Sequence, residues 1–308
     1  MNTIAIIPNN PFNKLTEPFL AAQDVGIRTK EAYASNIGYF FNYLQDNNIV
    51  IDGVEDIIAY KDYLIDQGKK AATVNAYLTA VKRFFAWLEM KGHYRDIAKS
   101  VKSVKGDKDY KKLPLTQIQW TLLKESLTRE DIITRRDLLL LALGVGVGLR
   151  TIEMSRLNVE DIQFHSGRWV AMITGKGSRG REQKPVILHE NLFALIKSFM
   201  QLRNITSGAL FTSLSNNSGS CNNDRLTTAG LRYIIKRRFA AVGINDSMIT
   251  AHSLRHSMAN WLLDAEVPIH EVQKAMRHDS IESTMIYVNS RSLYDNPASL
   301  KIDVLGVA

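Results

Sequence analysis

Two stripes of apolar side chains at helical spacing dominate the first third of this 308-residue chain. They recur every three or four residues, the period at which one face of an α-helix is buried. The members are Tyr33, Ile37, Phe40, Phe41 and Leu44, then Val74, Tyr77, Leu78, Val81, Phe85 and Leu88, with a shorter set between them at Val54, Ile57, Ile58 and Leu64. The spacing predicts a helical domain over residues 13–94 whose aromatic rings form a core rather than platforms for stacked bases.

Residues 95–112 contain seven basic side chains, few bulky apolar ones and no long helical stripe. This composition predicts a basic inter-domain linker. It fits a solvated tether and also a strap along a phosphate backbone, with Lys102 and Lys105 as candidate DNA contacts.

The rest of the chain alternates helical patterns with short strand patterns. We expect a mainly α domain with a small antiparallel β-sheet over residues 113–295, followed by a tail, 296–308. The predicted helices are 115–127, 131–145, 191–202, 228–242, 253–265 and 269–276, and the predicted strands are 162–164, 168–174 and 183–188. Residues 213–223 are expected to form a polar loop, with Cys221 as an inert surface thiol.

Composition excludes several classes of protein. The longest apolar run, Leu138 to Leu149, has twelve residues and is too short to span a bilayer. The single cysteine excludes an intramolecular disulfide framework, and the first ten residues lack a secretory signal, so we expect a soluble, cytoplasmic protein with no membrane partner. With 39 basic and 31 acidic side chains, the formal charge of +8 favours a polyanionic partner.

Two basic residues of the second domain are candidates for contacts with phosphate or for proton transfer. Arg150 ends the apolar run and precedes Glu153 by three residues, so it could pair with that carboxylate or hold phosphate oxygens with its planar fork. Lys176 lies between two glycines in the turn joining two predicted strands, where it could be ordinary surface or reach into a groove and donate a proton. The Gly-x-x-x-x-Gly-Lys-Ser/Thr pattern of a phosphate-binding P-loop is absent.

Two histidines and an arginine share one helical face near residue 252. His252 and Arg255 are three residues apart, and His252 and His256 are four apart, as in a metalloprotease zinc helix. That zinc chemistry needs a glutamate directly after the first histidine, where this chain has Ser253. We therefore expect neither a metal nor any other cofactor.

The order Arg, Lys, His-x-x-Arg, His, Tyr along this domain is much more specific than its parts. It resembles the tyrosine recombinase (phage-integrase) family, of the compact Xer-like plan, whose first domain is a helical DNA clamp. The resemblance implies six catalytic positions, Arg150, Lys176, His252, Arg255, His278 and Tyr287, with Glu153 orienting the first guanidinium. It implies that Tyr287 is the nucleophile, at the family's spacing from His278.

The implied reaction cuts and rejoins DNA strands through a 3′-phosphotyrosyl link and a Holliday junction. The implied partners are double-stranded DNA with a specific recombination site and a homotetramer on two such sites, with a second recombinase as a possible partner. Whether the chain is a resolvase or a mobile-element integrase, and whether Tyr287 acts in its own active site, stay open. The alternative from another class is a catalytically inactive DNA-binding regulator on the same fold.

Several positions depart from the family pattern or compete with the assignments. Met276-Arg277 stands where Leu-Gly is common, which brings an additional positive charge near the phosphate. The long basic hairpin makes Arg179 and Arg181 competitors of Lys176, whereas Tyr294 lies at the wrong distance from His278 to be the nucleophile.

Further DNA contacts are expected from basic residues on two predicted helices and on the long hairpin. The helical ones, which could also be ordinary solvated surface, are Lys82, Arg83, Lys236, Arg237 and Arg238, and the hairpin ones are Arg179 and Arg181. The tail carries Leu300, Ile302, Val304 and Leu305 and is expected either to dock on a neighbouring subunit or to cap its own.

Overall fold

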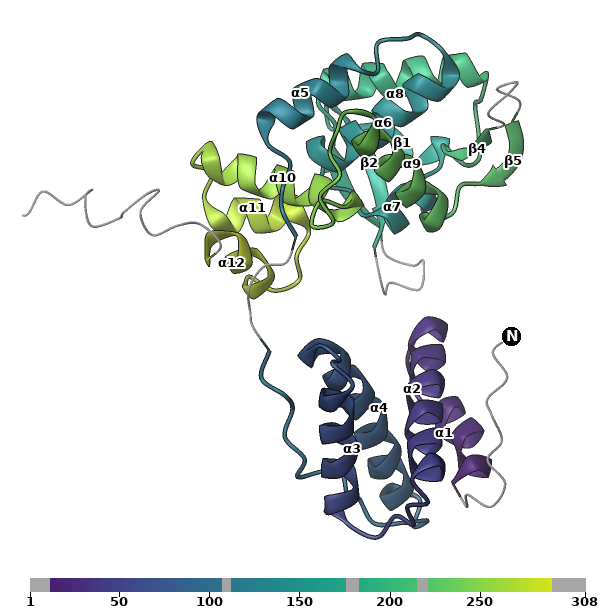
Figure 1. Ribbon diagram of the computed structural model, residues 1–308. Coiled ribbons are helices and arrows are strands. Elements are labelled where there is room, and N and C mark those ends of the chain that lie inside the picture. Colours follow the sequence, from purple (N-terminus) through teal and green to yellow (C-terminus); the bar gives the residue numbers. More distant parts are fainter. Residues whose placement is uncertain (1–11, 107–111, 176–182, 215–220, 290–308) are drawn as a thin grey trace, which may run out of the picture. The chain divides into compact units, whose positions relative to one another are not determined.

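A computed structural model describes residues 12–106, 112–175, 183–214 and 221–289 of the chain (Figure 1). The chain divides into two compact units, residues 1–108 and 109–308, and each has a hydrophobic core of its own. The division lies within the stretch predicted as a linker.

The described part of the first unit is helical. Its elements are the 3-10 helix η1 (Asn13–Leu15) and the α-helices α1 (Thr16–Ala22), α2 (Ile27–Asp46), α3 (Val54–Asp66) and α4 (Ala71–Met90). Helix α4 packs against α1, α2 and α3, which gathers the apolar stripes of the sequence on one side of each helix.

Aromatic rings fill the core of the first unit. Phe19 meets Phe84 edge to face at 5.4 Å between ring centroids, and Phe40 meets Tyr60 at 4.8 Å. These contacts place the positive ring edge on the negative ring face, the preferred arrangement for aromatic pairs. The core interpretation of the aromatic stripes is confirmed for the phenylalanines, whereas Tyr33 and Tyr77 are only partly buried.

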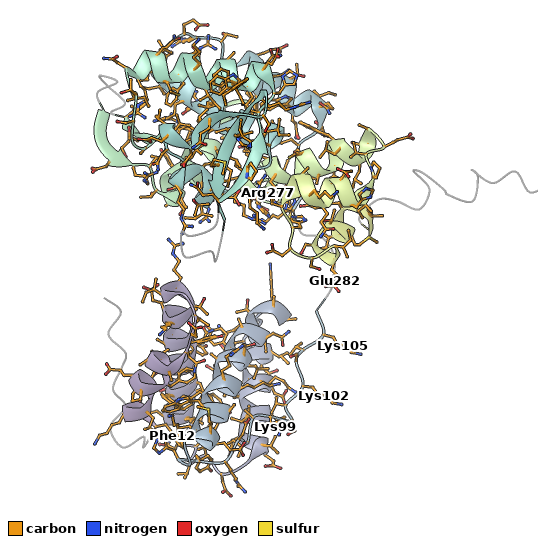
Figure 2. The ribbon with its side chains drawn as sticks, turned by 180° about the vertical axis from the view of Figure 1, so that it is seen from behind. Phe12, Lys99, Lys102, Lys105, Arg277 and Glu282 are labelled. Carbon is orange, nitrogen blue, oxygen red and sulfur yellow. The ribbon has the colours of Figure 1, made fainter. Side chains whose placement is uncertain are left out.

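The first half of the predicted linker packs onto the first unit. Ile97 and Val101 are buried in its core, and Asn75 exchanges two hydrogen bonds, of 2.8 and 2.9 Å, with the backbone of Val104. Lys102 and Lys105 lie exposed along this stretch, as Figure 2 shows. Residues 97–104 therefore follow a defined path over the unit rather than acting as a free tether.

The second unit combines helices with two small antiparallel sheets. Its elements are α5 (Gln117–Glu125), α6 (Ile132–Gly146), α7 (Thr151–Arg156), the 3-10 helix η2 (Val159–Asp161), β1 (Ile162–His165), β2 (Arg168–Thr174), β3 (Gln183–Ile187), α8 (Glu190–Arg203), β4 (Thr212–Leu214), β5 (Cys221–Arg225), α9 (Thr228–Ala241), α10 (Ala251–Asp264), α11 (Ile269–Met276) and α12 (Glu282–Asn289). Strand β2 pairs with β1 and β3, which confirms the predicted sheet.

Helix α6 is the central element of this unit and packs against α8, α9 and α10. Being apolar on nearly every side, it can be buried all round. Its approach to α10 is close: a β-carbon added at Gly144 would lie 2.6 Å from the β-carbon of Leu254. A glycine is thus needed where α6 supports the helix that carries His252 and Arg255.

The polar loop predicted over residues 213–223 is partly wrong. Strands β4 and β5 pair antiparallel there, with Leu214 opposite Cys221 and Thr212 opposite Arg225. A register shift between Thr212 and Ser213 interrupts the ladder. Among the described helices of the two units, none is both long and apolar enough to cross a membrane.

Candidate active site

The turn between α6 and α7 presents Arg150. Gly148 adopts a φ of +62°, a conformation that side chains disfavour, and this reverses the chain after α6. Arg150 then occupies the N-cap of α7, where its backbone N–H donates to Glu153 at 2.8 Å and its Nη1 donates to the same carboxylate at 2.8 Å. Arg150 can both pair with Glu153 and hold phosphate oxygens, because its side chain is 29% exposed even while it is paired.

Arg255 projects from α10 and is 1% exposed. Its guanidinium donates to two backbone carbonyls, those of Gly148 and Met276. Burial, followed by the charges of Arg150 and Arg277, lowers the pKa of Arg255 to about 9, so the group is still charged at neutral pH. The same lowering shows that three guanidiniums share one region.

Arg277, labelled in Figure 2, is the C-cap of α11, and its side chain is 9% exposed. It donates to the carbonyls of Val147 and Gly148 and to the carboxylate of Glu153, each at 3.1 Å. Burial raises the pKa of Glu153, but the charge of Arg277 and the bonds from Arg150 outweigh it and leave that pKa below its usual value. Glu153 is therefore ionised at neutral pH.

His252 and His278 both lie within the field of these arginines. Burial and then the charges of Arg255 and Arg150 lower the pKa of His252, and the same causes lower the pKa of His278 to about 4. The Nδ1 of His278 lies 2.9 Å from the hydroxyl of Thr284, which fixes the ring. A neutral imidazole can accept a proton or hydrogen-bond an oxygen, as general acid–base chemistry requires.

Tyr287 projects inward from α12 and is 3% exposed. Its hydroxyl lies 2.7 Å from the Nδ1 of His256, and its ring is nearly parallel to that of His278. Burial raises the pKa of Tyr287 to about 12 although Arg255 and Arg150 lower it. The phenol is thus neutral as placed and needs a proton acceptor to become a nucleophile.

The arrangement brings together five of the six predicted catalytic positions: Arg150, His252, Arg255, His278 and Tyr287. Three guanidiniums against one carboxylate leave a net positive charge around a phenol, a combination suited to a phosphodiester. Lys176 and its competitors Arg179 and Arg181 lie outside the described residues, as does Tyr294. In the part of the chain that the structure describes, no group of three or more His, Cys, Asp or Glu side chains is placed to hold a metal ion.

The residues predicted to contact DNA differ in their surroundings. Arg83 and Lys236 are exposed, as are Lys102 and Lys105, whereas Lys82 is partly buried and donates to the carbonyl of Val101. On α9, the two arginines that follow Lys236 lie close to a buried carboxylate.

That carboxylate belongs to Asp137, which is 0% exposed within α6. Arg238 donates to it at 2.6 Å, Arg237 lies 3.7 Å from it, and Arg136 pairs with its other oxygen at 2.7 Å. Arg238 therefore has a structural partner, which leaves Lys236 as the more available cation of this helix.

Two residues of the site escaped the sequence argument. The sequence indicates His256 only as half of a zinc pair, whereas in the structure it contacts the hydroxyl of Tyr287. The sequence indicates Arg277 only as an additional charge, whereas in the structure it contacts Glu153. The available signal was adjacency, since each directly follows or precedes a motif residue.

Comparison with known proteins agrees with this geometry. Residues 115–293 match the model of the "Phage integrase family", and residues 21–92 match that of the "Phage integrase, N-terminal SAM-like domain". Tyrosine recombinase XerA of Pyrococcus furiosus is 27% identical over 234 residues, which cover 75% of this chain and 74% of the relative. Tyrosine recombinase XerC of Corynebacterium glutamicum is 25% identical over 259 residues, 80% of each chain.

Solved structures share the fold at lower identity. The XerH recombinase bound to palindromic difH substrate matches with a TM-score of 0.68 and 20% identity, covering 94% of this chain and 82% of that one. The Tn1549 transposon integrase in complex with transposon right end DNA gives 0.69 and 16%, covering 96% and 99%. A lambda integrase tetramer bound to a Holliday junction gives 0.65 and 17%, covering 89% and 75%.

Proposed function

The chain belongs to the phage integrase family and is a site-specific tyrosine recombinase, and we propose that Tyr287 is the nucleophile that attacks the scissile phosphate. The observation that carries the assignment is the position of its hydroxyl, buried in the field of both Arg150 and Arg255. In cleavage, negative charge builds on the non-bridging phosphate oxygens, and two fixed guanidiniums neutralise it without being deprotonated.

The cleavage step forms one bond and breaks another. The oxygen of Tyr287 bonds to phosphorus, the bond from phosphorus to the 5′-oxygen breaks, and a 3′-phosphotyrosyl link remains. The phenolic proton passes to His252, while Lys176 donates the proton that the leaving 5′-oxygen needs. His278 hydrogen-bonds a phosphate oxygen, and Glu153 orients Arg150.

Joining reverses these steps with a different strand. A 5′-hydroxyl from the partner duplex attacks the phosphotyrosyl link and releases Tyr287, so the bond energy is kept and no ATP is needed. We extend to this chain the assembly of the lambda integrase to which it is similar, a tetramer on a Holliday junction. The four subunits would exchange strands in pairs between two DNA sites.

The partner in this proposal is double-stranded DNA carrying a specific site, met in the cytoplasm. The exposed cations Arg83, Lys102, Lys105 and Lys236 are the contacts we assign to the phosphate backbone. Xer recombinases and a transposon integrase are both among the similar proteins, so the proposal covers chromosome or plasmid resolution and mobile-element integration alike.

The test uses a duplex bearing the site that the protein selects from random sequence, with a nick next to the scissile bond that lets the short 5′ fragment escape. Wild-type protein should become covalently attached to this DNA, and Tyr287→Phe should bind it equally well without attachment. Arg150→Ala should slow attachment by about 100-fold or more. Attachment that persists in Tyr287→Phe refutes the nucleophile, and none with wild type would instead indicate the inactive regulator.

A further inference from the structure

We propose that Arg277 is a positioning residue for strand cleavage, which holds Glu153 and the carbonyl of Gly148 and through them orients Arg150 and Arg255. The inference rests on the function proposed above, because it concerns the same site. Arg277 is not one of the six catalytic residues that the family resemblance implies.

The first observation is the number of contacts that one guanidinium makes. Arg277 donates through Nη1 to the carbonyl of Val147 at 3.1 Å and to that of Ala275 at 3.2 Å. Through Nη2 it donates to Gly148 and to Glu153, both at 3.1 Å. One side chain from the end of α11 thus ties together the end of α6 and the first turn of α7.

The second observation links Arg277 to Arg150. Both arginines bind the carboxylate of Glu153, Arg150 at Oε1 and Arg277 at Oε2. Glu153 is 2% exposed, so it is held ionised by these partners rather than by water. Removing Arg277 leaves Oε2 with only the backbone N–H of Arg150 as a donor, so Arg150 is then bound to a carboxylate that protonates more readily.

The third observation links Arg277 to Arg255. The carbonyl of Gly148 accepts from both guanidiniums, and Arg255 also donates to the carbonyl of Met276, the residue directly before Arg277. Arg255 is therefore held by two carbonyls that depend on Arg277. The side chain of Arg277 also binds the carbonyl of Gly148, and the carbonyl of Met276 directly precedes Arg277 in the backbone.

The position argues against a simple role in shaping the turn. Arg277 has a φ of +53°, a left-handed conformation that is disfavoured for residues with a side chain and open to glycine. Its side chain is 9% exposed, and both of its terminal nitrogens already donate to protein acceptors. These contacts fit a group that acts through Glu153 and Gly148 rather than through the phosphate itself.

The test compares three variants with the wild type in the covalent attachment assay. Arg277→Met keeps much of the side-chain volume but loses the charge and the donors. Arg277→Gly fits the left-handed backbone and serves if the methionine variant fails to fold. Lys274→Ala is the matched control, since Lys274 lies on the same helix, is 72% exposed and pairs with Glu271.

We expect Arg277→Met and Arg277→Gly to bind DNA within about twofold of wild type and to attach at least about tenfold more slowly, since misplacing a catalytic group by about 1 Å can cost about 100-fold. Lys274→Ala should attach at the wild-type rate. The losses from Glu153→Gln and from either Arg277 variant should be less than additive in the double variants, because both changes disturb the same carboxylate.

The pH profile separates positioning from general support of the fold. Glu153 is faced by Arg150 at the start of α7, Arg255 of α10 and Arg277 at the end of α11. Without Arg277 the pKa of Glu153 rises, so the acid limb of the attachment rate should move to higher pH by about one unit or more. Glu153 should contribute a smaller acid-induced drop in the thermal midpoint of Arg277→Met than of wild type, because a folded-state pKa nearer the unfolded value removes that contribution, and this readout needs no activity.

The outcomes are distinct. If wild type attaches to DNA and both Arg277 variants attach at the wild-type rate, the positioning role is wrong and the proposed function stands. The positioning role is also overturned if the Arg277 variants attach more slowly, their acid limb does not move, and their loss adds fully to that of Glu153→Gln. If wild type itself never attaches, the proposed function fails, and the thermal midpoints alone decide whether Arg277 keeps Glu153 ionised.

Discussion

Two histidines of the site, the buried His256 and the partly buried His278, make the stability of this protein depend on pH. Burial, then the charge of His278, lowers the pKa of His256 to about 4, and burial with the neighbouring arginines lowers that of His278 to about 4. In the unfolded chain both imidazoles titrate near 6.5. The unfolded state therefore binds more protons than the folded state between these two values, and folding stability rises with pH there.

We expect the free energy of unfolding to be fully present above about pH 6.5 and to decrease as the pH falls toward 4. At about 1.4 kcal/mol for each unit of pKa, His256 alone would remove ~3 kcal/mol over that window. The check is a denaturant titration at several pH values on wild type and His256→Gln, whose pH dependence should be flatter. His270→Gln is the control, as His270 is 64% exposed beside Glu271. A His256→Gln curve parallel to wild type would contradict the assignment.

At this scale the sequence identified residues but not their contacts. Arg150, His252, Arg255 and Tyr287 were predicted from motif order, and the structure brings them into one cluster. The bond between Tyr287 and His256 joins residues 31 positions apart, and it depends on how α12 packs against α10. No local pattern reports such packing, which is why both this contact and the burial of Arg277 had to come from the structure.

At the scale of elements, the contact between α6 and α10 is the most sensitive to one substitution. Gly144→Ala would place a β-carbon 2.6 Å from that of Leu254, so the two helices must separate. We expect a loss of about 1–3 kcal/mol in the free energy of unfolding, as for other overpacked cores. Strand cleavage should fall more than stability explains, because α10 carries His252 and Arg255. Chemical denaturation and the attachment assay measure the two effects.

The matched control lies in the same helix. A β-carbon at Gly146 would meet the Cδ2 of Leu192 at 3.5 Å, an ordinary van der Waals contact. Gly146→Ala should therefore leave stability and attachment close to wild type. If both alanine variants behave alike, close packing at Gly144 is not the cause.

Helix α9 offers a second comparison between neighbouring cations. Lys236 is exposed, whereas Arg238 donates to the buried Asp137. Lys236→Ala should reduce the salt dependence of DNA binding by about one unit of slope and leave stability unchanged. Arg238→Ala should lower the free energy of unfolding by about 1–3 kcal/mol, because it removes a donor from a buried charge. Binding isotherms at several salt concentrations and thermal melts separate the two, and an unchanged slope for Lys236→Ala would remove it from the interface.

Elements with strong periodicity were predictable and those without it were not. The strand over residues 168–174 and the helix over 269–276 have the predicted bounds. Strands β4 and β5 were missed because residues 221–225, Cys-Asn-Asn-Asp-Arg, have low strand propensity and no alternation of apolar side chains. Their pairing rests on backbone hydrogen bonds that side-chain patterns do not report.

For the whole molecule, the geometry of the site bears on which subunit supplies the nucleophile. Tyr287 lies in the field of Arg150 and Arg255 of its own chain, which favours cleavage within one subunit. Mixing Tyr287→Phe with Arg150→Ala should then restore no attachment, since each subunit lacks one part of its site. Attachment at a sizeable fraction of the wild-type rate would mean that the tyrosine is delivered to a neighbour. Electrophoresis of labelled suicide DNA under denaturing conditions reads out the result.

The organisation into two units was anticipated where composition changes sharply. Residues 95–112 lose the apolar stripes of the first unit, and the division of the chain lies among them. The exact end of the first core was not predictable from the sequence, because Ile97 and Val101 are isolated apolar residues in a basic stretch and form no periodic pattern. Whether Ile97 and Val101 are buried depends on the surface of the first unit against which they pack, and the local sequence does not report that surface.

The sheltered phenol on α12 has a consequence for genome integrity. Tyr287 is 3% exposed and its hydroxyl hydrogen-bonds an imidazole, so the residue is shielded from a passing duplex. With Tyr287 as the nucleophile, we therefore predict that a subunit in this conformation leaves DNA that it merely contacts uncut. Strand cutting would then require a rearrangement that brings the hydroxyl of Tyr287 to the DNA.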